Sequence, residues 1–183
     1  CYSGSTLAEE GRVIAMYHGR ELGNMCATSH DPLLLNWEKV AGTTVIPLNK
    51  DGQRFHFLSH EPLPYRIYDA CIWRKGGLYY SLSGSVSYEG PAGQPVLAEF
   101  LFRSPDLAHW DFVHDFVRGN RFTQPGDDGA CPYFWPIGRR HILILFSHTS
   151  SAQYLLGDYD QEHDTFSTTA HGRFCFGPVL PGA

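Results

Sequence analysis

Three copies of one hairpin pattern constrain the fold more than any other feature of the sequence. Each copy reads as a strand, a turn that contains glycine, and a second strand rich in β-branched and aromatic residues. The turn glycines Gly11, Gly77 and Gly138 recur at intervals of about 60 residues. The second strands, VIAMYHG, LYYSLSG and HILILFSH, are too short for helices and lack helix caps. We therefore expect an all-β chain built from repeated small sheets.

A second shared element follows the hairpins. The segments SHDPLLLNW and SPDLAHW both carry a serine, an aspartate two residues later, and a tryptophan that opens an alternating strand. GDYDQEHDTFS is a weaker third copy, with Phe166 in the aromatic place. An aspartate in such a turn can accept hydrogen bonds from nearby backbone amides, while the aromatic side chain packs into the layer. We therefore interpret three aspartates as structural residues: Asp31, Asp106 and Asp160.

Repeats of this length, with about four short strands each, are typical of β-propeller blades. A closed propeller needs at least four blades, whereas the chain offers three copies of the pattern. We therefore expect residues 1–183 to form part of a larger propeller, and its exposed blade edges should favour self-association. The composition agrees with this fold, since aromatic residues make up 14% of the chain and 19 Gly and 12 Pro supply turns.

The charge and the cysteine content indicate which classes of partner and which cellular compartment to expect. A net charge of -5 without a Lys/Arg run makes nucleic acid an unexpected partner, and no apolar run is long enough to cross a membrane. On a strand, His109 and His114 would face opposite sides, so we expect no metal site, and nothing indicates a cofactor. The dispersed cysteines form no Cys-x-x-Cys pair, which favours free thiols and, slightly, a cytoplasmic location: Cys1, Cys26, Cys71, Cys131 and Cys175.

The first strand of each repeat should line the central channel of a propeller, so its polar residues are candidates for a ligand site. These strands, CYSGSTL, YRIYDACIW and DDGACPYFW, begin with polar residues and become apolar. Asp69 lies in an otherwise apolar run, where a carboxylate needs a partner or a function. Arg66 is the nearest candidate partner, so a buried ion pair and a functional acid both stay open.

Carboxylates, aromatic faces and hydroxyl groups together favour sugar chemistry, because glycoside cleavage generally uses two carboxylates. A serine hydrolase is disfavoured, since no G-x-S-x-G element occurs. Trp73 and Trp135 are possible stacking faces for a sugar ring, with packing in the blade core as the alternative.

The first strands resemble, in matching order, motifs of the glycoside hydrolase family 32 catalytic domain, the five-bladed β-propeller of invertases, inulinases and levanases. CYSGS is similar to the family's Phe-Ser-Gly-Ser, which implies that Tyr2 and Ser3 contact the fructose ring. MYHG is similar to its Tyr-Thr-Gly. YRIYDACIW occupies the place of Arg-Asp-Pro, which implies that Asp69 stabilises the transition state, with Tyr68 where the family has arginine.

The resemblance fails at one important position. GACPYFW occupies the place of the family's Glu-Cys-Pro, so Cys131 would lie at the substrate, but Ala130 stands where the acid/base glutamate is expected. Asp128 lies two residues earlier, on the same face of an extended strand and displaced by about 6.5 Å. We expect Asp128, or Asp127 if a bulge alters the register, to supply the acid. The alternative is that the acid/base is lost or comes from elsewhere in the full-length protein.

The resemblance as a whole implies a hydrolase of β-fructosidic bonds in sucrose, inulin or levan. It also implies that this chain covers blades two to four, with the first and last blades outside it. The family's nucleophilic aspartate belongs to a Trp-Asn-Asp-Pro-Asn-Gly element that would precede Cys1. Two other functions stay open: a propeller that binds sugars without cutting them, and a related furanosidase that acts on arabinosides.

Overall fold

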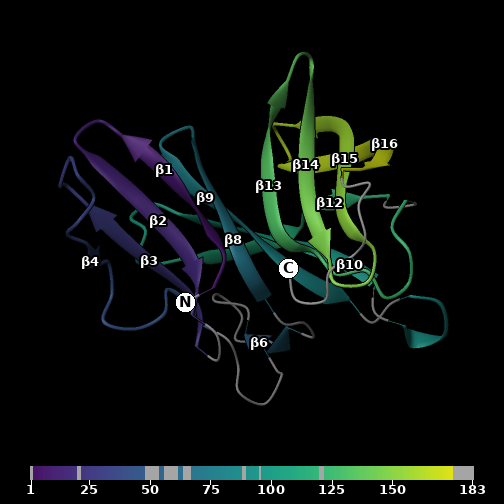
Figure 1. The fold of residues 1–183 in the computed structure, drawn as a ribbon, viewed down its shortest axis with the longest axis horizontal. Helices are drawn as coiled ribbons and strands as arrows, with labels where there is room; N and C mark the ends of the chain where they lie inside the picture. The colour runs from purple at the N-terminus through teal and green to yellow at the C-terminus, as the bar shows by residue number, and fades with distance from the viewer. Residues whose placement is uncertain are drawn as a thin grey trace.

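The regular secondary structure of the described part of the chain is almost entirely β-strand (Figure 1). The computed structural model describes residues 2–19, 22–47, 54–55, 62–63, 67–87, 90–94, 96–119 and 122–174. Within these ranges the only helical element is one 3-10 turn, Pro91–Gly93, and no helix is long and apolar enough to span a bilayer. The expectation of an all-β chain is confirmed.

The strands form three larger antiparallel sheets that follow one another along the chain. The first sheet contains β1 (Gly4–Glu9), β2 (Arg12–His18), β3 (Gly23–Ser29), β4 (Glu38–Lys39) and β5 (Ile46–Pro47). The second contains β8 (Ile67–Lys75), β9 (Leu78–Ser87), β10 (Val96–Ser104) and β11 (Asp111–Asp115). The third contains β13 (Ala130–Ile137), β14 (Arg140–Ser147), β15 (Ser151–Asp160) and β16 (Thr165–Arg173), with β12 (Val117–Arg118) parallel to β16. A separate pair is formed by β6 (Arg54–Phe55) and β7 (Pro62–Leu63).

Each larger sheet begins with the hairpin that the repeat predicts. The strands of all three hairpins are joined by two-residue turns. The backbone angle φ is positive at Gly11, Gly77 and Gly138, with values of 78°, 84° and 59°. A residue with a β-carbon is strained in this conformation, which explains why glycine recurs at these turns.

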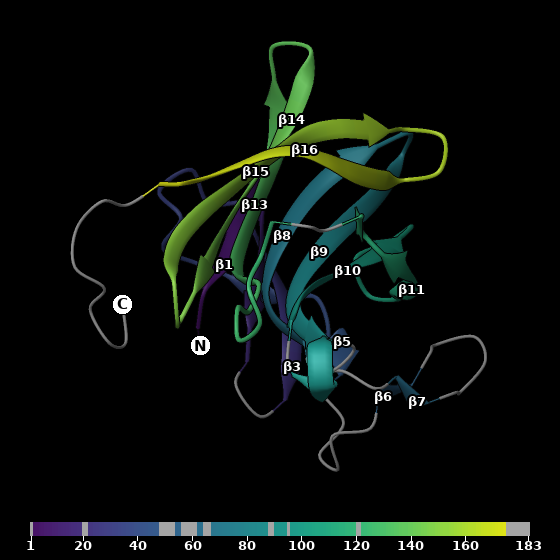
Figure 2. The same cartoon turned by 90° about the vertical axis from the view of Figure 1, so that its right-hand side faces the viewer.

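The second sheet is buried on both faces, because the other two sheets pack against it. On β10, Phe100 and Phe102 point into the core shared with the first sheet. Leu97 and Leu101 point into the core shared with the third sheet. As a result β8 lies between β1 and β13 (Figures 1 and 2). The first strands therefore lie side by side, as expected for strands around a channel.

The three turn aspartates have the structural role that the sequence predicts. Asp31, Asp106 and Asp160 each accept hydrogen bonds from backbone amides two to four residues later. The packing of the aromatic residue differs between copies. Trp110 is 3% exposed, but Trp37 is 39% exposed, which contradicts the expectation that both pack into a layer. Both indoles donate to a backbone carbonyl three residues earlier, so the turn is the same and only the surrounding packing differs.

Candidate active site

Asp69 lies in a β-bulge of the central strand β8. Ile67 pairs with Ser85 and Ala70 pairs with Ser83, so β8 contains one extra residue between these two pairs. Bulges re-aim side chains and are common beside active sites. The Asp69 side chain is 8% exposed, as the apolar sequence around it indicates. The expected partner Arg66 lies outside the described residues.

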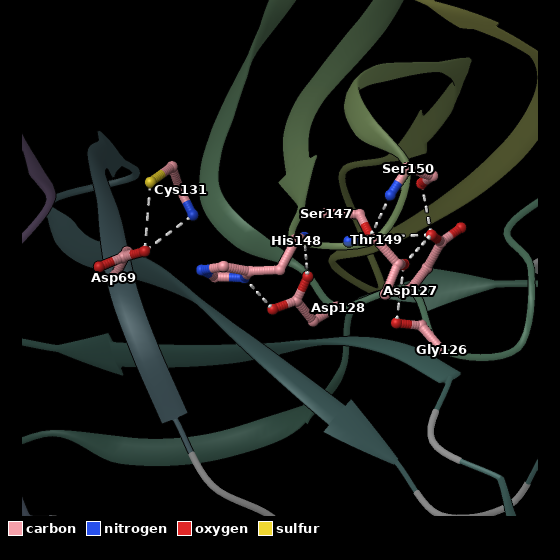
Figure 3. Close-up of polar contacts among 9 residues, drawn as sticks. All are labelled: Asp69, Gly126, Asp127, Asp128, Cys131, Ser147, His148, Thr149 and Ser150. Carbon is pink, nitrogen blue, oxygen red and sulfur yellow. Dashed lines mark hydrogen bonds and ion pairs between the residues drawn. The ribbon is translucent and has the colours of Figure 1, made fainter. Parts of the chain in front are cut away.

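A second bulge, in β13, brings Cys131 to Asp69. Ala130 pairs with Phe146 and Tyr133 with Ile144, which leaves one extra residue in β13, and the φ angle of Cys131 is 49°. The backbone N–H and the thiol of Cys131 both donate to Oδ2 of Asp69, at 2.9 Å and 3.2 Å (Figure 3). Burial raises the pKa of the Cys131 thiol to about 11 against a hydrogen bond with Ser3, and the charge of Asp69 adds to the rise. The thiol therefore stays protonated and acts as a donor.

Aromatic rings lie next to this pair, around a histidine that the sequence analysis did not single out. The ring centroid of His18 is 6.1 Å from that of Tyr2 and 6.4 Å from that of Tyr68. His18 is buried, its Nδ1 lies 3.1 Å from Oδ1 of Asn24, and Asn24 donates to Ser83 at 2.9 Å. Tyr2, at 56% exposed, is the open member of this group. The sequence signal for His18 was its place in the family-like motif MYHG.

The two adjacent aspartates before β13 have different surroundings. Asp128 accepts a hydrogen bond from the backbone N–H of His148 at 2.9 Å, and its Oδ2 lies 2.6 Å from Nδ1 of the same histidine (Figure 3). The charge of Asp128, like that of Asp69, contributes to the raised pKa of Cys131. The charges of both Asp69 and Asp128 therefore act on the Cys131 thiol.

Asp127, in contrast, belongs to a buried polar network. It is 2% exposed and accepts hydrogen bonds from Ser147 at 2.8 Å, from Thr149 at 3.2 Å and from the backbone of Gln124 at 2.8 Å. Burial acts to raise the pKa of Asp127, but the hydrogen bonds outweigh it and the pKa is lowered. These contacts tie the loop before β13 to the end of β14, which is a structural role.

Glu99, on β10, is an acid that the sequence analysis missed. Its side chain is 1% exposed, and neither carboxyl oxygen has a hydrogen-bond partner within the described ranges. Burial, and then the charges of Asp69 and Asp128, raise its pKa well above the ordinary value. A β-carbon added at Gly129 would lie 2.2 Å from Oε1 of Glu99, so this glycine makes room for the carboxyl group. The sequence signal for Glu99 was a single acidic residue within the apolar run VLAEFLF.

The two candidate tryptophans lie in different places. Trp73 packs against Tyr80, Phe116 and Phe134, with ring centroids 5.7 to 6.2 Å apart, inside the core between the second and third sheets. This placement supports the core-packing alternative for Trp73. Trp135 is 41% exposed, but it lies four residues beyond Cys131 along β13, a rise of about 13 Å.

An open hollow of about 510 Å³ lies among the first strands and β2. Its lining comes from β1, β2, β8 and β13 and includes Ser5, Cys71 and Tyr133. The hydroxyl of Tyr133 lies 3.4 Å from the carbonyl oxygen of Gly4, so β13 approaches β1 across this space. The first strands of the three sheets therefore lie next to one another, as the sequence predicts, and the central channel stays a prediction.

Residues 1–175 match the family described as "Glycosyl hydrolases family 32 N-terminal domain". The chain belongs to glycosyl hydrolase family 32. This membership agrees with the order of the family-like motifs on β1, β8 and β13.

Relatives and solved structures agree with the family. The chain is 25% identical to the "Beta-fructofuranosidase, insoluble isoenzyme 6" of Oryza sativa subsp. japonica, and the match covers 94% of this chain and 32% of that protein. It is 26% identical to the "Fructan 6-exohydrolase" of Triticum aestivum, over 91% of this chain and 30% of that protein. The chain thus spans about a third of the length of these relatives.

The Bombyx mori GH32 β-fructofuranosidase has the same fold, with a TM-score of 0.67 at 20% identity, over 97% of this chain and 38% of that one. This likeness confirms the propeller-type fold of the family 32 chain. The five-blade count and the assignment to blades two to four stay predictions.

Proposed function

We propose that the protein containing this family 32 chain hydrolyses β-fructosidic bonds of the sucrose, inulin or levan type. The observation that carries the proposal is the contact between the two bulged first strands, in which Cys131 of β13 donates twice to Asp69 of β8. It unites the two family motifs, and the charge of Asp128 acts on the same thiol. The names of the rice and wheat relatives support the substrate class.

In this proposal Asp69 stabilises the positive charge that develops on the sugar ring as the glycosidic bond breaks. Its two hydrogen bonds from Cys131 orient the carboxylate without neutralising it, because the raised pKa of the thiol keeps the proton on sulfur. Tyr2, Ser3 and Tyr68 would contact the sugar beside it. The proton for the leaving oxygen would come from the beginning of β13, where Asp128 lies two residues before Ala130.

A second function, sugar binding without cleavage, is favoured by one observation. Ala130 is 6% exposed and its methyl group cannot donate a proton, so a chain that kept the sugar contacts could have lost the chemistry. The two functions differ in a direct measurement on the full-length protein, because only one of them predicts turnover.

The test is hydrolysis of sucrose, inulin and levan by the full-length protein and by Asp69→Asn. We expect measurable turnover that falls about 10²- to 10³-fold in the variant, the size of loss seen when preorganised electrostatic stabilisation is removed. Retained turnover in Asp69→Asn would contradict its role. Sugar binding by the wild-type protein, with no turnover on any substrate, would favour the second function.

A further inference from the structure

We propose that His148 is the group that hands the proton to the leaving oxygen, and that Asp128 holds its imidazole in place. This inference rests on the proposed glycosidase function and deepens it. His148 belongs to none of the family-like motifs, and it lies 20 residues from Asp128 along the chain. Asp128 of this pair lies two residues before Ala130, the residue that the family resemblance aligns with an acid/base glutamate.

The register of the β13–β14 hairpin puts His148 at this place. Ala130 pairs with Phe146, and Asp128 and His148 lie just beyond this end of the two strands. The backbone N–H of His148 donates to Asp128 at 2.9 Å, so the two residues are joined across the end of the hairpin. Next to them, Asp127 and Ser147 are buried and are joined by a hydrogen bond of 2.8 Å. His148 therefore lies at the end of the hairpin where β13 begins, two residues past the partner of Ala130.

The hydrogen bond to Asp128 determines which ring nitrogen can exchange a proton. The Nδ1–H group of His148 donates to the carboxylate of Asp128, so the proton exchanged with a ligand is carried by Nε2. This division of roles, with a carboxylate that orients an imidazole and an imidazole that transfers protons, is effective in other hydrolases. In Figure 3 the ring extends from Asp128 toward Asp69 and Cys131.

Exposure also favours His148 over the two carboxyl groups nearby. The His148 side chain is 67% exposed, whereas that of Asp128 is 19% exposed and holds the histidine with both oxygens. Glu99 is 1% exposed and lies beneath Gly129, where a substrate oxygen does not reach it. A group that protonates the leaving oxygen has to contact it, and His148 is the member of this set that a sugar can contact.

The proposed step is balanced. The bond between the anomeric carbon and the leaving oxygen breaks as the nucleophilic carboxylate that the family resemblance implies bonds to that carbon. The electron pair of the broken bond goes to the leaving oxygen, which takes the proton from Nε2 of the imidazolium. Water then displaces the carboxylate from the anomeric carbon, and the proton that the water loses returns to Nε2. Asp69 stabilises the positive charge on the sugar ring. The Nδ1–H group of His148 stays hydrogen-bonded to Asp128 throughout.

The test uses two fructosides that differ in the leaving group. Sucrose needs protonation of its leaving oxygen, whereas p-nitrophenyl β-D-fructofuranoside loses p-nitrophenolate without it. In the full-length protein we expect His148→Gln to lose about 10²- to 10⁴-fold in kcat/KM on sucrose and far less on the nitrophenyl substrate. Added imidazole should partly restore sucrose hydrolysis in His148→Gly.

His109→Gln is the matched control, because His109 makes the same Nδ1 contact with an aspartate, at 2.7 Å, on an outer turn. It should leave both rates unchanged.

Two failures can be told apart. If the wild-type protein hydrolyses sucrose and His148→Gln loses nothing, or loses equally on both substrates, the role of His148 is overturned and the proposed function stands. If the wild-type protein hydrolyses neither of these substrates nor inulin nor levan, the proposed function fails, and the role of His148 with it.

Discussion

The outer turns and the beginning of β13 each contain a histidine paired with an aspartate, but the surroundings of the pairs differ. On the outer turns Asp106 pairs with His109 and Asp160 with His163, each at 2.7 Å, and each pair lies within three residues of sequence. At the beginning of β13, Asp128 pairs with His148 at 2.6 Å across 20 residues. The carboxylates of the outer pairs are 47% and 49% exposed, and that of Asp128 is 19% exposed.

This difference separates a turn cap from a candidate catalytic pair. The outer aspartates also bind the backbone amides of their own turns, so their histidines are accessory. Asp128 is contacted by the backbone N–H and the ring of His148 from the far side of a hairpin, and its charge helps to raise the pKa of Cys131. The contact geometry is alike, and the surroundings decide what each pair can do.

The largest expected difference between the two regions is kinetic. Asp128→Asn should lower kcat on sucrose about 10²- to 10⁴-fold, because an amide no longer stabilises the imidazolium of His148. Asp106→Asn should leave kcat unchanged. The double variant Asp128→Asn/His148→Gln should be no slower than the slower single variant, since residues that act as a unit are not additive. Additive losses in steady-state kinetics would show that the two residues act separately.

The next effect is on stability near the same strand. A β-carbon at Gly129 would lie 2.2 Å from Oε1 of Glu99 and 3.1 Å from the backbone oxygen of Ala98. Gly129→Ala should therefore lower the free energy of unfolding by about 1–3 kcal/mol, as overpacked sites do. Gly42→Ala is the control, because a β-carbon at Gly42 meets nothing within 4 Å. Urea unfolding of the full-length variants measures both, and equal midpoints would mean that Glu99 moves aside at no cost.

Glu99 should also make the free energy of unfolding depend on pH. Its effect should have the opposite sign to that of Asp106 on an outer turn. The pKa of Glu99 in the folded protein is raised above 4.5. Its contribution to stability is therefore complete below the unfolded pKa and is lost as the pH rises above 4.5. Glu99→Gln cannot ionise, so its free energy of unfolding should fall less than that of the wild type over this range. Parallel curves in pH-dependent urea titrations would contradict the buried, neutral state of Glu99.

The smallest expected effect belongs to an outer turn. Hydrogen bonds with His109 lower the pKa of Asp106 to about 2, from 3.8. Its contribution to stability is present above pH 3.8 and is lost as the pH falls toward 2. Asp106→Ala should cost about 0.5–1.5 kcal/mol near neutral pH, the range for an exposed hydrogen-bonded turn, and should leave turnover unchanged. Thermal unfolding at neutral and acidic pH is the measurement, and a larger deficit at acidic pH would contradict the role.

Sequence patterns predicted well the features that depend on nearby residues. The glycine turns, the three hairpins and the turn aspartates follow from residues only a few positions apart, so the same local signals recur in each copy. Burial of Asp69 could also be predicted, because the residues around it are apolar. Trp37 shows the limit of this approach, since its turn matches that of Trp110 but nothing local determines what packs against the indole.

The sequence by itself therefore determined the strands, the repeat and the burial of Asp69, because short-range hydrogen bonds and the two-residue period of a strand depend on residues close together in the chain. Tertiary structure decided which groups meet. Cys131 reaches Asp69 across 62 residues because both strands contain a bulge, and bulges break the two-residue period. Glu99 lies beneath Gly129, and His148 lies opposite Asp128, only because the sheets pack and pair in one register.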